Sequence, residues 1–132
     1  MTQIHWIHPI SGDFSDGADW NGGVPPGAGD QAILGAAGAA AYTVTASTNE
    51  TVKALQTASN ATLSITGGQF DATSGTGVGA NAGLISVGEA ANLALSGGVD
   101  NLGTIALTSA AQGARLTIGA SGATFTGAER SL

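Results

Sequence analysis

The sequence contains no cysteine and carries little charge. Its 132 residues include three Lys and Arg and nine Asp and Glu, which gives a formal net charge of −6 at pH 7. The lack of cysteine excludes a disulfide framework and thiolate chemistry. The lack of cations argues against binding nucleic acid or an anionic membrane through charge, because both interactions need clustered Lys and Arg.

Signals for export or membrane insertion are also missing from the sequence. The N-terminal residues do not show a basic segment followed by an apolar one, so we expect no Sec-type signal peptide in this chain. No apolar run approaches the ~20 residues that a helix needs to span a bilayer, so we expect no membrane insertion.

Small and apolar residues dominate what is present. Glycine accounts for 22 residues, hydrophobic residues for 42% of the chain and charged residues for only 9%. Disordered chains combine high charge with low hydrophobicity, which is the opposite composition. The length is that of one domain with a single sizeable core. We therefore expect many small and branched side chains to be buried in one regular structure.

A short motif recurs in the second half of the chain. Asn, Gly, Ile and an aliphatic residue occupy the same offsets in 81–87 and in 101–107, 20 positions apart. Extended backwards, the pattern predicts four units of two strands each, with an insertion at 69–80 in the longer second unit. The units are expected to start near Asp30, Thr51, Asn81 and Asn101.

The alignment of the units predicts which residues stack on one another. One apolar column is expected to contain Leu34, Leu55, Ile85 and Ile105. A second apolar column is expected to contain Tyr42, Leu63 and Leu93. The four residues at which the units start, Asp30, Thr51, Asn81 and Asn101, are expected to form a side-chain ladder at one turn.

The apolar residues of each unit alternate with polar or small residues, which is the period of a half-buried strand. A β-sandwich also uses short strands and frequent turns, but it gives no reason for successive units to repeat the same residues. A β-solenoid does, because each unit is one coil that stacks on the next. We therefore expect an all-β fold, a right-handed parallel β-helix of about four coils, with 1–29 as an N-terminal cap and 30–132 as the repeats.

Two stretches resemble segments of bacterial autotransporter-passenger-like and large adhesin-like β-helix proteins. "TVTASTNETVKALQTASNATLSITGG" is similar to one of their coils, and "SGDFSDGADWNGGVPPGAGDQAIL" is similar to a segment that often precedes such coils. The resemblance implies a bacterial secreted or surface protein that acts as a stalk, adhesin or scaffold. It also implies an extracellular or cell-surface location.

The N-terminal stretch gathers bulky apolar residues that are scarce elsewhere, among them Trp6, Phe14 and Trp20. Because a solenoid end exposes its interior column, terminal units must be covered, and these residues suit a cap. A calcium site is the alternative, since Asp13, Asp16 and Asp19 recur every third residue beside a glycine that permits a tight loop. Apart from this calcium, we expect no cofactor.

Binding of a cell-surface glycan is a further alternative for this region, because Trp6, Trp20 and Tyr42 are flat rings of the kind that stack on sugars. His5 and His8 form a weak metal signal, since no third ligand has a fixed spacing and a strand would separate them. The acids Asp71, Glu89 and Asp100 are scattered through different units, whereas polysaccharide-cleaving enzymes need paired acids. We therefore expect no enzymatic activity.

The C-terminal residues read as a strand without a charged closing segment, so we expect an open coil that continues into a longer chain or pairs with another copy. The residues expected at the two associating ends are Trp6, Phe14 and Trp20 at one and Phe125 and Leu132 at the other. The hypothesis is a contact in which the N-terminal stretch of one copy seats on the last coil of the next, which would produce open filaments. The sequence thus predicts a non-enzymatic structural solenoid, an adhesin or matrix segment, with a carbohydrate- or calcium-binding module at 13–20 as the alternative.

Overall fold

The computed structural model describes residues 2–36, 38, 40–77, 79–88 and 90–108 in full and 115–131 as backbone. Apart from one short 3-10 helix, the elements of these residues are β-strands, which follow one another in this order: β1 (Thr2–His5), β2 (Gly12–Asp13), the 3-10 helix η1 (Gly17–Asp19), β3 (Asp30–Leu34), β4 (Tyr42–Ala46), β5 (Glu50–Val52), β6 (Ala54–Thr57), β7 (Ala61–Ile65), β8 (Gln69–Ala72), β9 (Leu84–Val87), β10 (Asn92–Leu107) and β11 (Arg115–Ser131).

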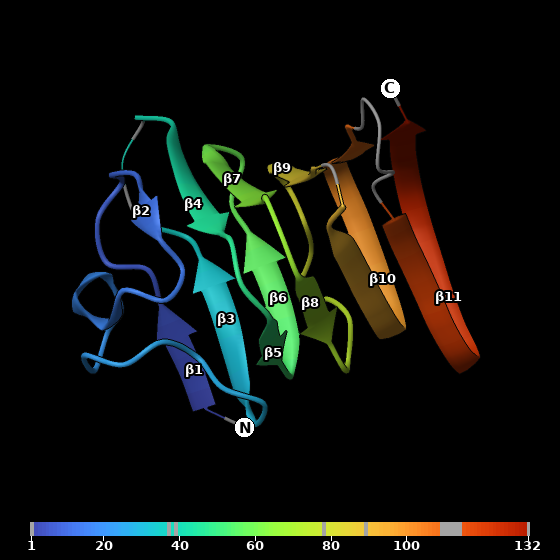
Figure 1. Ribbon diagram of the computed structural model, residues 1–132, viewed down its shortest axis with the longest axis horizontal. Helices are drawn as coiled ribbons and strands as arrows, with labels where there is room; N and C mark the ends of the chain where they lie inside the picture. The colour runs from blue at the N-terminus through green and yellow to red at the C-terminus, as the bar shows by residue number, and fades with distance from the viewer. Residues whose placement is uncertain are drawn as a thin grey trace.

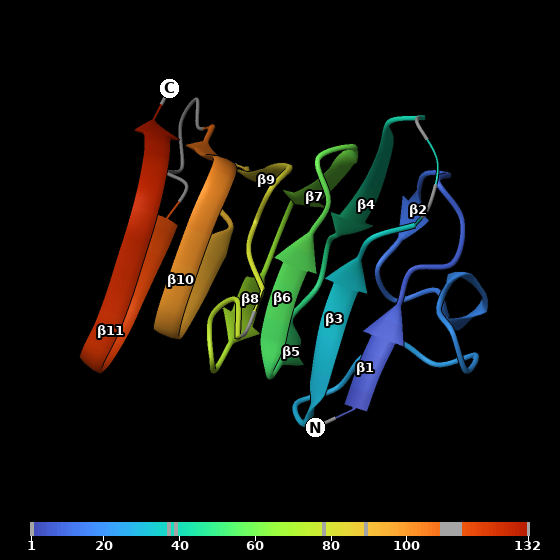
Figure 2. The same ribbon diagram turned by 180° about the vertical axis from the view of Figure 1, so that it is seen from behind.

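The strands stack in parallel as a β-solenoid of about three turns, which confirms the predicted fold class with about one turn fewer. Three faces run along the stack. The first contains β1, β3 and β6; the second contains β2, β4, β7, β9 and the end of β10; the third contains β5, β8 and the start of β10. In Figures 1 and 2, the N-terminal strands lie at one side of this stack and β11 lies at the other.

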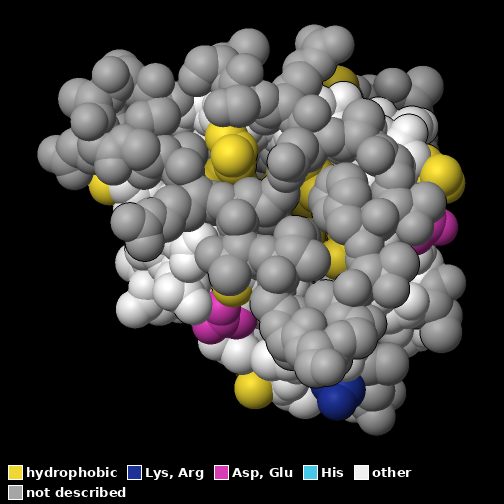
Figure 3. Space-filling view, turned by 90° about the vertical axis from the view of Figure 1, so that its right-hand side faces the viewer, with side chains coloured by type: hydrophobic (Ala, Val, Ile, Leu, Met, Phe, Trp, Pro, Cys, Tyr) yellow, Lys and Arg dark blue, Asp and Glu magenta, His cyan; other side chains and the backbone are white. Residues whose placement is uncertain are grey.

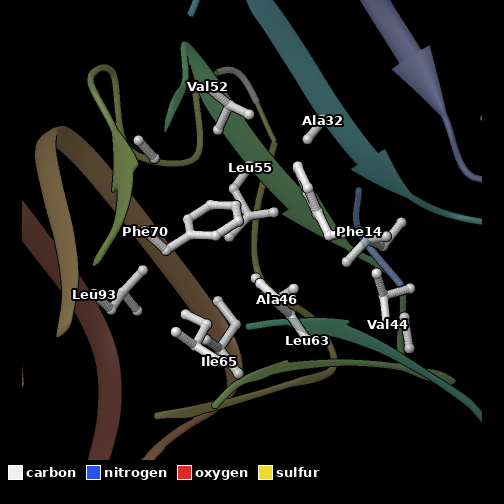
Figure 4. Packing of buried hydrophobic residues seen from close by; sticks show 14 of the residues in the cluster. Phe14, Ala32, Val44, Ala46, Val52, Leu55, Leu63, Ile65, Phe70 and Leu93 are labelled. Atoms are coloured by element: carbon white, nitrogen blue, oxygen red, sulfur yellow. The ribbon is translucent and has the colours of Figure 1, made fainter. Parts of the chain in front are cut away.

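The core fills the inside of the solenoid because every second residue of most strands points inward. In β4 and β7 this gives an alternation of buried and half-buried side chains over five residues. Figure 4 shows inward side chains from all three faces, such as Leu55 on β6, Leu63 on β7 and Phe70 on β8, meeting in the core. The fully buried large residues are Trp6, Trp20, Phe14, Phe70, Leu34, Leu55, Leu63, Ile65, Ile85, Leu93, Leu95 and Ile105.

The register confirms part of the predicted stacking and corrects the rest. Ile85 lies opposite Ile105, as expected. Leu63, however, lies opposite Ile85 on the second face, whereas Leu93 lies on the third face. The second and third faces show the same alternation of apolar and polar residues. The alignment of the units therefore placed residues from both faces in one column.

Two other expectations about the units were wrong in part. Leu34 lies opposite Thr57, two residues beyond the expected Leu55. The segment taken as the start of an insertion is strand β8, which pairs with β5 and β10. The later part of that segment, described over 73–77 and 79–80, leaves the strand pattern as a loop beside the first face, where the Gly75 carbonyl accepts a hydrogen bond from Leu55 N–H at 3.0 Å.

A ladder of inward polar side chains is present, and it consists of Thr57, Asn81 and Asn101. Thr57 takes the place of two predicted members, Asp30 and Thr51. Asn81 and Asn101 are buried, and the Asn81 Nδ2 donates to Asn101 Oδ1 at 2.8 Å. The Thr57 hydroxyl donates to the Asn81 Oδ1. Asp30 instead accepts a hydrogen bond from Gly27 N–H at 2.8 Å, and Thr51 is exposed on the third face.

The glycine that accompanies Asn in the repeated motif has a separate structural reason. A Cβ at Gly103 would overlap the carbonyl oxygen of Gly83 and lie 2.8 Å from the Ala82 carbonyl. A Cβ at Gly83 would likewise overlap carbonyl oxygens of the preceding turn. The motif therefore combines an inward amide with a position at which successive backbones approach too closely for any side chain.

Candidate functional site

The N-terminal cap is built around three buried aromatic rings. Trp6, Phe14 and Trp20 are each at most 1% exposed. The rings of Trp6 and Trp20 lie edge to face at 5.0 Å, and Phe14 contacts Trp20 at 5.0 Å and Phe70 at 5.2 Å in the same arrangement. This is the favourable geometry for aromatic pairs. Phe14 thus reaches from the cap into the interior column.

Both indole N–H groups of the cap have backbone partners. Trp20 Nε1 donates to the Phe14 carbonyl at 2.7 Å, and Trp6 Nε1 donates to the Ile10 carbonyl at 3.0 Å. A buried tryptophan needs such a partner, because an unsatisfied buried donor costs about 1–3 kcal/mol. The two tryptophans therefore hold the cap loops in place through hydrogen bonds as well as through packing.

The cap is also closed by its own backbone. Residues 19–21 run antiparallel to residues 5–7, with a bridge between Trp6 and Trp20. Ile7 N–H donates to the Asp19 carbonyl at 3.0 Å, and Asn21 N–H donates to the His5 carbonyl at 2.8 Å. The intervening η1 is preceded by its N-cap residue Asp16, whose carboxylate accepts from Ala18 N–H at 3.1 Å.

The three predicted calcium ligands lie in this cap, but they do not form a shared oxygen cage. Asp13 and Asp16 are exposed, and Asp16 is occupied as the N-cap of η1. The Asp19 carboxylate lies over Gly12, where an added Cβ would come within 2.8 Å of its Oδ2. Within the described ranges, no group of three or more His, Cys, Asp or Glu side chains could hold a metal ion. The calcium site remains a prediction that this geometry does not support.

The rings proposed for sugar binding are part of the core. Trp6, Trp20 and Tyr42 are at most 2% exposed, so none offers a free face on which a sugar could stack. The Tyr42 hydroxyl accepts a hydrogen bond from Ala36 N–H at 3.1 Å. Burial raises the pKa of Tyr42 above its usual value, and this hydrogen bond lowers it by a smaller amount. The burial of these three rings does not support the prediction that a sugar stacks on them.

The other candidate groups lie apart. His5 lies on β1 and His8 in the bend that follows, and both are exposed. Asp71 is half-buried on the third face, where its Oδ1 accepts from Gln69 Nε2 at 2.7 Å, and Asp100 is exposed on β10. Glu89 lies outside the described residues.

Two residues that the sequence did not single out are unusual in the structure. Gln31 on β3 is 1% exposed, and its Nε2 has no hydrogen-bond partner among the described residues. Glu50 is half-buried on β5; burial raises the pKa of its carboxyl, and a hydrogen bond from Thr48 opposes that shift. The alternation of residues could not reveal the burial of Gln31, because Gln31 takes a position that faces outward in the strand pattern and is covered by other parts of the chain.

The two ends of the stack differ. At the N-terminal end, the predicted association residues Trp6, Phe14 and Trp20 are buried, so their rings are not available as a contact surface. At the other end, β11 pairs with β10 along both halves of its length, and no strand in the described part of the chain pairs with its outer side. The side chain of Phe125 and all of Leu132 lie outside the described residues.

Figure 3 views the molecule from the β11 end. The described hydrophobic and acidic side chains that it shows lie at several separate places rather than in one cluster. In the part of the chain that the structure describes, no helix has the length and apolar character to cross a membrane.

No protein-family model, curated protein or solved structure matches this chain. The resemblance to autotransporter-passenger-like and adhesin-like proteins is therefore supported at the level of the parallel β-solenoid and its repeats, and no family is shown.

Proposed function

We propose that the chain is a non-enzymatic structural segment, one piece of a rod-like solenoid in a bacterial secreted or surface protein of the adhesin or matrix type. The observation that carries the proposal is the continuous interior column, which links the turns from Trp6 in the cap to Ile105 in β10. A chain whose inward residues serve to stack one turn on the next is suited to spanning distance and bearing load.

The β11 end supports extension of the rod. In β11, residues 115–119, 124–127 and 129–131 all pair in parallel with β10. An edge with this geometry can continue the same hydrogen-bond pattern into one more coil. The proposed neighbour at this edge is a further coil of a longer chain or a second copy of this chain.

The alternative, a module that binds calcium or a glycan at 13–20, has no specific observation in its favour. Its three rings are buried, and its carboxylates are not gathered around one point.

The experiment that tests the structural proposal measures ligand binding and particle shape together. We expect no glycan binding on an array and no change of melting temperature with added calcium, while negative-stain electron microscopy shows compact solenoid particles or end-to-end assemblies. A calcium-dependent rise of the melting temperature that is lost in Asp16→Ala would overturn the proposal in favour of a calcium module. Specific retention of a glycan would overturn it in favour of a lectin-like module.

A further inference from the structure

One asparagine of the chain, Asn21, is followed by a glycine. The others, which are followed by glutamate, alanine or leucine, are Asn49, Asn60, Asn81, Asn92 and Asn101. Asparagine is a thermolabile residue, because the backbone nitrogen of the next residue can attack the carbonyl carbon of its amide. A side chain on that next residue hinders the attack, and glycine has none. Asn21 is therefore the asparagine at which this reaction meets the least steric resistance.

The structure also leaves the amide of Asn21 free to react. Asn21 is exposed, and its amide has no hydrogen-bond partner among the described residues. By contrast, the Asn49 amide accepts a backbone hydrogen bond at 2.9 Å, and the Asn60 amide donates to two backbone carbonyls at 2.9 and 3.2 Å. Asn81 and Asn101 are buried in the ladder of inward polar side chains. These four amides would have to give up a hydrogen bond before they react, whereas Asn21 has none to give up.

The attacking group, the Gly22 nitrogen, is unobstructed as well. Its N–H has no backbone acceptor among the described residues, and nothing lies within 4 Å of the position that a Cβ on Gly22 would take. The Gly23 N–H donates to the Trp20 carbonyl at 3.0 Å, so Asn21 and Gly22 are the central residues of a tight turn. Because φ is +94° at Gly22 and is not positive at Asn21, this is a type II turn.

The turn is the barrier that the folded chain adds to the reaction. In a type II turn the first central residue has ψ of about +120°, which directs the following nitrogen away from that residue's side chain. The Asn21 Cα–C bond must therefore rotate before the Gly22 nitrogen can reach Asn21 Cγ. This rotation breaks the hydrogen bond between Gly23 and Trp20, which is a local opening and does not require the core to unfold.

We propose that Asn21 is a site of spontaneous deamidation in the folded protein. The Gly22 nitrogen forms a bond to Asn21 Cγ, the Cγ–Nδ2 bond breaks, and ammonia leaves with the proton of the Gly22 N–H, which yields a five-membered succinimide ring. Water then opens the ring, with its hydroxyl on the attacked carbonyl and its hydrogen on the nitrogen. Opening at Cγ gives aspartate, and opening at the main-chain carbonyl gives isoaspartate. No group is oxidised or reduced.

The two products affect the cap differently. Both place a new carboxylate on a chain whose formal net charge is already −6. Isoaspartate also adds one carbon to the main chain after the Asn21 N–H, which bonds to the His5 carbonyl at 2.8 Å. The added carbon lies before Gly23, whose carbonyl approaches Gly17 so closely that a Cβ on Gly17 would overlap it. The longer main chain disturbs this approach, so isoaspartate should weaken the cap more than aspartate does. This chemistry does not depend on the proposed structural function.

The test incubates the full chain in mildly alkaline buffer and reads both products. The tryptic fragment that ends at Lys53 contains Asn21 and Asn49 and no other asparagine, so tandem mass spectrometry compares the site with an internal control in one fragment. Isoaspartyl methyltransferase with a labelled methyl donor measures isoaspartate. Asn21→Gln is the matched variant, because it keeps the amide and the backbone N–H but requires a larger ring. Asn21→Asp adds the charge without lengthening the main chain.

We expect the Asn21 amide to be lost several-fold faster than the Asn49 amide in the folded chain, with isoaspartate among the products. The aged chain should melt at a lower temperature than the fresh chain and than fresh Asn21→Asp, whereas Asn21→Gln should keep its melting temperature. Loss of the Asn21 amide only in urea would overturn the site, because the turn would then stay closed in the folded chain. Equal loss at Asn21 and Asn49 would overturn it too, and so would Asn21→Gln that ages like the wild type.

Discussion

Replacement of Asn81 by alanine should cause one of the largest losses of stability available to a single substitution in this chain. The Asn81 side chain accepts a hydrogen bond from the Thr57 hydroxyl and donates to Asn101 Oδ1 at 2.8 Å and to the Thr104 carbonyl at 3.1 Å. Each such bond contributes about 1 kcal/mol net, and a buried partner that loses its bond adds a desolvation cost. We expect Asn81→Ala to lower the free energy of unfolding by about 3–4 kcal/mol.

Urea unfolding followed by circular dichroism measures this loss, and a loss of that size is a large fraction of the roughly 5–15 kcal/mol that keeps a domain folded. Asn60→Ala is the control, since Asn60 donates to two backbone carbonyls at the surface, at 2.9 and 3.2 Å. Its expected cost is about 1 kcal/mol. A double-mutant cycle with Asn101→Ala should give a coupling of about 0.5–3 kcal/mol. Equal costs for Asn81→Ala and Asn60→Ala, with no coupling to Asn101, would refute the ladder as a stabilising element.

Three further predictions concern single side chains. Gln31→Met should raise the free energy of unfolding by about 1 kcal/mol, because it removes a buried amide donor without a partner; equal or lower stability in urea would contradict this reading. Gly103→Ala should destabilise the protein because its Cβ would overlap the Gly83 carbonyl, whereas Gly98→Ala, with open space around the Cβ, should change little; equal melting temperatures for the two variants would contradict the close approach. Since burial raises the pKa of Glu50 in the folded state, the favourable contribution of this carboxyl is present below its ordinary pKa of 4.5 and is lost as the pH rises through the folded-state pKa. Glu50→Gln should therefore be more stable than the wild type at neutral pH, with the difference disappearing in acid, and an unchanged pH profile of stability would show that the burial of Glu50 has no energetic effect.

The sequence was sufficient to predict the solenoid because a two-residue alternation and a 20-residue repeat both act locally along the chain. The pairs Asn81–Asn101 and Ile85–Ile105 followed directly from that repeat. The number of faces did not follow, because the second and third faces carry the same pattern of apolar residues. Thr57 was missed for a related reason, since a threonine facing inward beside an asparagine cannot be told from an outward one by residue type.

The cap illustrates a different limit. Its aromatic composition predicted that it covers the end of the column, and the burial of Trp6, Phe14 and Trp20 agrees with that interpretation. Whether the rings would face the core or the solvent depends on residues 19–21 folding back onto residues 5–7, which is a contact between segments with no shared pattern. The regular spacing of Asp13, Asp16 and Asp19 suggests a calcium site as an alternative to the cap, whereas the role of Asp16 as the N-cap of η1 is visible only in the structure.

The loop beside the first face has a consequence for how such a chain can change length. From Thr57 to Asn81 the ladder advances by 24 residues, and from Asn81 to Asn101 by 20. The extra residues fall between the end of β8 at Ala72 and Asn81, and the inward side chains remain in line. Insertions and deletions in this part of a turn should therefore be tolerated during evolution, whereas loss of a single inward position would shift every later side chain to the opposite face. New loops for recognition could be added to the outside of the rod at such sites without redesign of its interior.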